Sequence, residues 1–230
     1  MKKKIMIIVI FNCIIQSYAI SSEDLQKKSF LRTACCLLLG TANAPDDIQS
    51  CFTNAADNFD ISQDKRLPIK LINKCPVLNS FSSFTWFGTW INRDYWQKMS
   101  NLEQEWSACH EIAHQKLNHP KKQIITAASA LFSSAVFSYY FKFQPLSAIA
   151  ITGSLLAFVS SSYAHICERQ ADILAAQTLY SKDKGDIVAE HIKSLSFEPN
   201  EWSMWFNSPA DQIKYLQAIK DVSITNAIIT

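Results

Sequence analysis

The sequence predicts an α-rich α+β fold, in which a mostly helical chain carries a small β-sheet and an apolar helical hairpin. Only two short segments, 69–72 and 83–91, have the β-branched and aromatic composition of strands. Two uncharged apolar stretches, 123–141 and 143–164, are separated only by Lys142 and broken at Gln144-Pro145, as expected of two helices joined by a turn. The 230 residues suit a sizeable core, and the formal net charge of +2 gives no reason to expect a nucleic acid as a partner.

Residues 1–19 have the pattern of a secretory signal peptide. Three lysines at Lys2–Lys4 precede an apolar run from Ile5 to Ile15, and Ser17-Tyr18-Ala19 offers small residues where a signal peptidase cleaves. We therefore expect cleavage after Ala19, with an uncleaved membrane anchor as the alternative. Either outcome exports the rest of the chain, to the periplasmic side in a bacterium. Later cysteines permit disulfides, such as Cys35 or Cys36 with Cys51.

Two helices are expected before the first strand. Apolar residues at helical spacing predict the first, and Pro45-Asp46-Asp47 has the proline and acids typical of a helix start. A polar stretch that ends in Pro68 then separates this part from the strands. These signals predict helices at 23–39 and 45–59, a linker at 65–68, an N-terminal helical region over 20–66 and a second domain over 67–230.

The helix that follows the strands carries the most informative motif of the chain. Asp94 or Ser100 is expected to cap this helix, which contains His110, Glu111 and His114. Two imidazoles four residues apart share one helix face and can bind the same zinc ion, and the glutamate between them is placed to act as a general base. The alternative is a pair of solvated or packed histidines. With five histidines in the chain, this spacing favours the metal.

A zinc site of this kind needs a third protein ligand, and Glu168 is the best candidate. Glu168 and Asp172 are again four residues apart, so they project from one helix face just after a long apolar stretch. One carboxylate can bind the metal while the other accepts the free N–H of a ligating histidine. Cys109 and Cys167 each precede a candidate ligand, but adjacent helical residues point about 100° apart, which favours buried thiols over a fourth ligand.

These residues resemble the gluzincin membrane metallopeptidases, the family of the CAAX prenyl protease and the bacterial heat-shock membrane protease. The motif at 110–114 and the acids Glu168 and Asp172, which match the family's Glu-x-x-x-Asp signature, carry the resemblance. Asn79-Ser80-Phe81 and the strand after it are weaker matches, and the similarity runs from about Ile69 to Ile219. The resemblance implies a gluzincin catalytic core, one zinc ion and membrane helices between the two motifs.

The chain departs from this family near its C-terminus. Asn207-Ser208-Pro209-Ala210 stands where the family normally has Thr-His-Pro-Pro before a last amphipathic helix. A contribution of that histidine is therefore missing at Ser208. His165 or His191 could donate to an oxyanion in its place, although packing or surface roles are the alternative for both.

The apolar hairpin over 123–164 is expected to cross a membrane. Its two stretches, 123–141 and 143–164, are each long enough to span a bilayer, and their serines and alanines suit close packing of membrane helices. Two core helices of a soluble protein are the alternative. If the hairpin spans, His114 and Glu168 lie within about 15 Å of the lipid boundary.

Together, these features predict an exported, membrane-associated zinc endopeptidase that hydrolyses proteins or peptides at or near a membrane. His110, His114 and Glu168 would bind one Zn²⁺, Glu111 would be the catalytic base, and Asp172 would orient a ligand. The alternative is a zinc-stabilised binding or chaperone-like protein that keeps the gluzincin fold without turnover. Ser208 favours this alternative, whereas the intact Glu111 opposes it. The strand before the motif helix could also pair with an extended peptide if it is an edge strand, or be an ordinary core strand.

Overall fold

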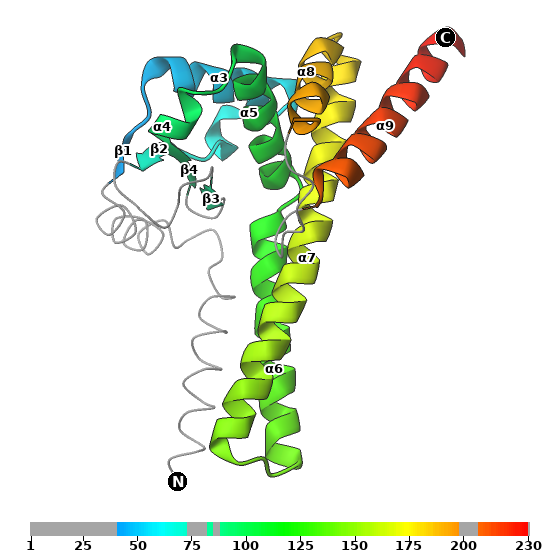
Figure 1. The fold of residues 1–230 in the computed structure, drawn as a ribbon. Coiled ribbons are helices and arrows are strands. Elements are labelled where there is room, and N and C mark those ends of the chain that lie inside the picture. The colour runs from blue at the N-terminus through cyan, green and yellow to red at the C-terminus, as the bar shows by residue number, and fades with distance from the viewer. Residues whose placement is uncertain (1–40, 73–81, 85–87, 198–206, 230) are drawn as a thin grey trace.

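The computed structural model describes residues 41–72, 82–84, 88–197 and 207–229. The expected signal peptide, the helix at 23–39, Cys35, Cys36 and the segment Asn79-Ser80-Phe81 lie outside these residues. The described part is rich in helix and includes one small sheet (Figure 1). Its elements are β1 (Thr41–Asn43), α3 (Asp46–Asn58), a short 3₁₀ turn (Gln63–Lys65), β2 (Ile69–Ile72), β3 (Ser82–Phe84), β4 (Gly88–Asn92), α4 (Arg93–Trp96), α5 (Asn101–Lys116), α6 (His119–Tyr140), α7 (Pro145–Ser181), α8 (Gly185–Leu195) and α9 (Pro209–Ile229).

The four strands form a mixed sheet in the order β1-β2-β4-β3. β2 runs parallel to β4, whereas β1 and β3 pair antiparallel with β2 and β4. The expectation of one strand over 83–91 is wrong, because Ser82–Phe84 and Gly88–Asn92 are two strands that pair antiparallel with each other, Phe84 opposite Gly88. The strand that leads into the motif helix is therefore an inner strand. Among the described residues, β3 is the edge strand on this side of the sheet.

The main core lies where α3, α7 and α8 pack around α5. Phe52 on α3, Ile112 on α5, Leu179 on α7 and Val188 on α8 are all buried in one apolar cluster. α5 is the central element of this cluster, and it has partners on several sides (Figure 1). Its position is consequently fixed by packing as well as by its own hydrogen bonds.

α6 and α7 pair as an antiparallel hairpin that extends away from this core (Figure 1). The chain turns at residues 141–144, where Lys142 has a left-handed backbone (φ 52°) and Pro145 starts the next helix, as the sequence predicts. α7 has 37 residues and continues through the hairpin into the core, which makes it about 55 Å long. One helix thus joins the apolar hairpin to the acids Glu168 and Asp172.

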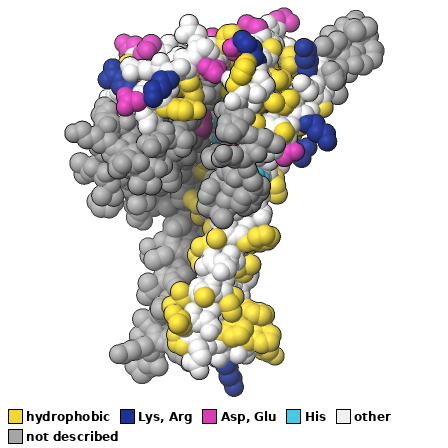
Figure 2. Space-filling view, viewed as in Figure 1, with side chains coloured by type: hydrophobic (Ala, Val, Ile, Leu, Met, Phe, Trp, Pro, Cys, Tyr) yellow, Lys and Arg dark blue, Asp and Glu magenta, His cyan; other side chains and the backbone are white. Residues whose placement is uncertain are grey.

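α7 is the one helix of the described residues that is long and apolar enough to cross a membrane. α6 does not pass the same test, so the second span of the expected hairpin has less support from composition. Both helices nevertheless leave large apolar side chains exposed over their hairpin part, including Phe132, Tyr140, Leu146 and Phe158. Figure 2 shows apolar side chains over this region, with most charged side chains gathered on the other end of the molecule.

Candidate metal centre

α5 holds the histidine motif in its last two turns. Ser100 caps this helix: its hydroxyl accepts from the backbone N–H of Glu103 at 3.3 Å, and the Glu103 carboxylate accepts from the Ser100 N–H at 2.8 Å. Asp94, the other expected cap, lies instead in the first turn of α4. The continuous helix places His110 and His114 on one face, as the sequence predicts.

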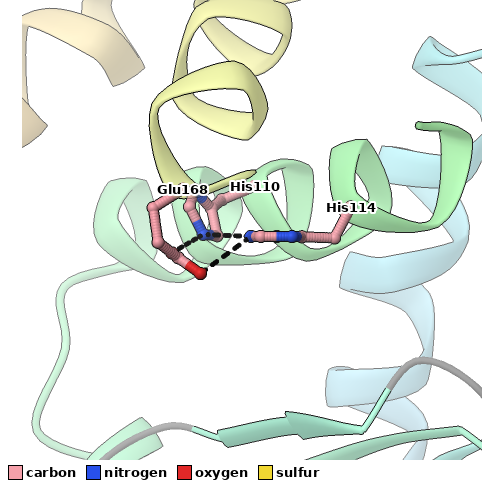
Figure 3. Close-up of side chains that lie close together, drawn as sticks. All are labelled: His110, His114 and Glu168. Carbon is pink, nitrogen blue, oxygen red and sulfur yellow. Dashed lines mark hydrogen bonds and ion pairs between the residues drawn. The ribbon is translucent and has the colours of Figure 1, made fainter. Parts of the chain in front are cut away.

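α7 brings Glu168 to these histidines from 58 residues along the chain. The Nε2 atoms of His110 and His114 are 3.0 Å apart, and the Glu168 carboxylate lies 3.1 Å from the first and 3.4 Å from the second. Figure 3 shows the three side chains converging from two helices. One oxygen or nitrogen of each residue lies within 4.8 Å of the others, and all three side chains are largely buried.

The donor set fits a zinc ion in kind and in spacing. Two imidazoles and one carboxylate are the ligands of many catalytic zinc sites, which leave a further position for water. Ligand atoms about 2.0–2.1 Å from a tetrahedral zinc are about 3.3 Å apart. The two Nε2 atoms are 3.0 Å apart, and each histidine has its own carboxylate oxygen nearby, with Oε2 of Glu168 3.1 Å from His110 and Oε1 of Glu168 3.4 Å from His114. Each histidine thus has a carboxylate oxygen near the distance expected between two ligands of one zinc ion.

Asp172 holds the opposite nitrogen of His110. Its Oδ1 lies 2.7 Å from His110 Nδ1, and its Oδ2 accepts a hydrogen bond from the hydroxyl of Tyr215 on α9. The guanidinium of Arg169 lies over the Tyr215 ring, 5.3 Å from its centre. Asp172 thus occupies the position from which a carboxylate orients a metal-binding histidine.

The charges of this cluster favour a cation. Burial opposes ionisation of His110, but Asp172 and then Glu168 outweigh it and raise its pKa well above the ordinary value. Burial likewise opposes ionisation of Glu168, and hydrogen bonds from His110 and His114 hold its pKa below the ordinary value. The Glu168 carboxylate therefore remains ionised in a buried site, where a divalent ion would balance its charge.

Glu111 lies on α5 between the two histidines and is buried, with 6% of its surface exposed. Glu111 precedes His114 by three residues, so the two residues lie within one turn of α5. The neighbouring cysteines, Cys109 and Cys167, are free thiols buried in the interior and are absent from the metal-binding group. Cys51, also a free thiol here, lies 3.7 Å from the Gln104 carbonyl oxygen.

His119 is a member of the cluster that the sequence analysis did not identify. It is fully buried, and its Nδ1 lies 3.0 Å from the Nδ1 of His114. Burial and then the neighbouring His114 lower its pKa to about 4, so it is neutral near pH 7. The available signal was its position, five residues after His114 in a chain with five histidines.

The structure describes Ser208, which stands in the place of the C-terminal histidine, and the candidate replacements His191 and His165. The Ser208 hydroxyl accepts from the Asp211 N–H at 3.2 Å and lies 2.7 Å from the Asp211 carboxylate, so it caps α9. The His191 ring stacks on Trp106 with ring centres 4.3 Å apart. The backbone oxygen of His165 accepts from the side chain of Asn207 at 3.2 Å.

The fold and this centre agree with the comparison with known families. The model of peptidase family M48 matches residues 43–218, most of the chain. No curated protein and no solved structure matches the chain. The protein belongs to peptidase family M48, a gluzincin metallopeptidase family whose members depend on zinc and include the CAAX protease.

Proposed function

We propose that this protein is a zinc-dependent endopeptidase with a gluzincin catalytic core. The observation that carries the proposal is the convergence of His110, His114 and Glu168 at the spacing of zinc ligands. In this assignment these three residues hold the ion, Asp172 orients His110, and Glu111 is the catalytic base. The membership of family M48 supports the same chemistry.

Each group has one task in peptide hydrolysis. Zinc, when bound, supplies a Lewis acid that polarises the scissile carbonyl and makes water easier to deprotonate. Glu111 accepts a proton from the attacking water on its carboxylate and then donates that proton to the nitrogen of the leaving amine. Asp172 keeps the proton of His110 on Nδ1, which leaves Nε2 free to bind the metal.

We further propose that the α6–α7 hairpin spans a bilayer and that the catalytic core lies outside the cytoplasm. The apolar length of α7 and the exposed apolar side chains of both helices support this placement. A bilayer around residues 145–164 of α7, about 30 Å of helix, would end about 6 Å before Glu168. Proteins in the membrane or peptides emerging beside it are therefore the proposed substrates.

Replacement of Glu111 by glutamine tests the enzymatic assignment directly. We expect Glu111→Gln to bind one zinc per chain like the parent but to cleave casein and membrane-protein substrates at least about 100-fold more slowly, because the amide cannot take the proton. Zinc content and cleavage should be measured side by side on the full-length protein in detergent. Glu105→Gln is the matched control, since Glu105 lies on the same helix and pairs with the surface residue Lys184 at 3.6 Å.

The outcomes separate the two candidate functions. Cleavage by Glu111→Gln at the parental rate would contradict the proposed mechanism. A parent protein that binds zinc but cleaves none of the substrates would instead favour the non-catalytic, zinc-stabilised binding protein. A parent that binds no zinc would contradict both assignments.

A further inference from the structure

His119 has a hydrogen-bond partner for each of its ring nitrogens. Its Nδ1 lies 3.0 Å from His114 Nδ1, and its Nε2 lies 3.1 Å from the side-chain oxygen of Gln170 on α7. Its ring meets the His114 ring at 75°, with centres 4.9 Å apart. His119 therefore connects the second histidine of the motif to the helix that carries Glu168.

A tight turn between α5 and α6 brings His119 back onto His114. The N–H of Leu117 still bonds to Ala113 at 2.9 Å, and the next residue, Asn118, has a left-handed backbone with φ 55°. Asparagine tolerates this conformation better than most residues. His119 then starts α6 as a fully buried residue, and Pro120 follows in the first turn, where its missing N–H costs little.

The protons of these groups can be placed in one consistent way. His114 turns Nε2 toward His110 and Glu168, so in the proposed function this nitrogen binds zinc and Nδ1 carries the proton. The Nδ1–H of His114 then donates to His119 Nδ1, which must be the unprotonated nitrogen of that ring. The proton of His119 lies on Nε2, which donates to the Gln170 oxygen.

We propose that His119 is a positioning residue for the zinc site, which fixes the ring orientation and tautomer of His114 and is itself held by Gln170. The proposal rests on the zinc-binding role of His114 given above. It makes the two histidines of the motif equivalent in one respect, because each has its second nitrogen held by a buried side chain. Asp172 supplies a charged acceptor to His110, whereas His119 supplies a neutral acceptor to His114.

A residue that only fills space makes a different prediction from a positioning residue. Loss of a space-filling histidine would lower the free energy of unfolding and leave the zinc affinity of the folded protein unchanged. Loss of a positioning residue lowers the metal affinity, typically by about 10–100-fold, since the ligand ring is no longer held in its binding orientation.

The test compares His119→Leu with His119→Asn in the full-length protein in detergent. Leucine has a similar size and no acceptor, whereas the side-chain oxygen of asparagine can replace Nδ1 as the acceptor from His114. We expect zinc affinity, measured by competition with a chromophoric chelator, to fall about 10–100-fold in His119→Leu and by less than about tenfold in His119→Asn. The visible absorption of the cobalt-substituted proteins should change in the leucine variant and stay close to the parent in the asparagine variant.

Two further variants complete the experiment. Phe52→Leu is the control for loss of packing alone, because Phe52 is buried against Trp96 and is not part of the metal-binding group, and it should bind zinc like the parent. Gln170→Met changes an exposed residue, so it should fold even if His119→Leu does not. Its loss of one hydrogen bond to His119 should weaken zinc binding about two- to tenfold.

Several results would overturn the proposal. Parental zinc affinity in a folded His119→Leu, equal losses in the leucine and asparagine variants, or parental affinity in Gln170→Met would each do so. A parent protein that binds no zinc would contradict the proposed function itself, so the two failures are distinguishable.

Discussion

The two acids of α7 lie one turn apart and contact opposite sides of His110. Glu168 approaches Nε2 at 3.1 Å, the side shared with His114, whereas Asp172 approaches Nδ1 at 2.7 Å. A carboxylate on the shared side can bind the metal directly, and one on the far side can act only through the histidine ring. The two residues should therefore respond differently to substitution.

We expect Glu168→Ala to lose stoichiometric zinc, because it removes one of three protein ligands. Asp172→Asn should keep the metal but bind it about 10–100-fold more weakly, since the amide accepts a weaker hydrogen bond from His110. Metal analysis after dialysis and a chelator competition measure both effects. If both variants hold zinc like the parent, the third ligand lies elsewhere in the chain.

His191 gives the stability of the protein a specific dependence on pH. Burial lowers its pKa to about 4; the charges of Asp172 and Glu103 raise the pKa only in part, and the charge of His110 lowers it further. Between about pH 6.5 and pH 4 the unfolded chain binds a proton at this residue that the folded chain does not bind. Its contribution to stability is thus present above pH 6.5 and is lost as the pH falls toward 4.

Replacement of His191 by phenylalanine removes this titration and keeps an aromatic ring against Trp106. We expect the free energy of unfolding of His191→Phe, relative to the parent, to rise by on the order of 1 kcal/mol between pH 7.5 and pH 5. Urea unfolding of the zinc-free forms at both pH values measures this difference without the effect of metal release. A difference that does not change with pH would show that His191 titrates normally.

At the scale of single elements, the N-terminal cap of α5 should contribute to folding stability without affecting metal binding. The Ser100–Glu103 capping box satisfies backbone N–H groups at the first turn, two turns before His110. Packing against α3, α7 and α8 holds the later turns. Fraying of the first turn should therefore not reach the metal centre.

Ser100→Ala should consequently lower the free energy of unfolding by about 1 kcal/mol and leave zinc affinity unchanged. Ser107→Ala is the control, because Ser107 lies in the middle of the same helix and contributes no cap; its effect should stay within about 0.5 kcal/mol. Chemical denaturation and chelator competition give the two quantities. A parallel loss of zinc affinity in Ser100→Ala would show that the site depends on the whole helix.

For the whole molecule, the orientation of the hairpin decides where the enzyme acts. α6 and α7 run antiparallel, so a hairpin that spans the membrane returns the chain to its starting side (Figure 1). The exposed residues Lys121 and Gln177 would then share one compartment, and Gln144 at the turn would lie in the other. This arrangement can be tested by chemical labelling.

We expect cysteines placed at Lys121 and Gln177, in a background without other cysteines, to react with an impermeant maleimide added outside the cytoplasm. A cysteine at Gln144 should react only after the membrane is opened, because it lies on the cytoplasmic side. The protein should also stay in the membrane fraction after an alkaline carbonate wash. Equal labelling of all three positions together with release by carbonate would identify α6 and α7 as core helices of a soluble enzyme.

Much of the local structure followed from the sequence. The structure confirms the start of α3, the strand at 69–72, the Ser100 cap and the break before Pro145, because each depends on residues close together in the chain. The single strand expected over 83–91 was wrong. The available signal was Gly88, one of four glycines in the chain, because a glycine inside a strand pattern often marks a break in the strand.

The sequence by itself determined which residues share a helix face and which family the chain belongs to. Helix geometry fixes the spacing of His110 with His114 and of Glu168 with Asp172, whatever surrounds them. Only the tertiary structure decided which acid faces both histidines, since that depends on how α5 and α7 pack although His110 and Glu168 are 58 positions apart in the chain. The same packing recruited His119 and Tyr215, whose roles arise from contacts between helices and leave no periodic signal in the chain.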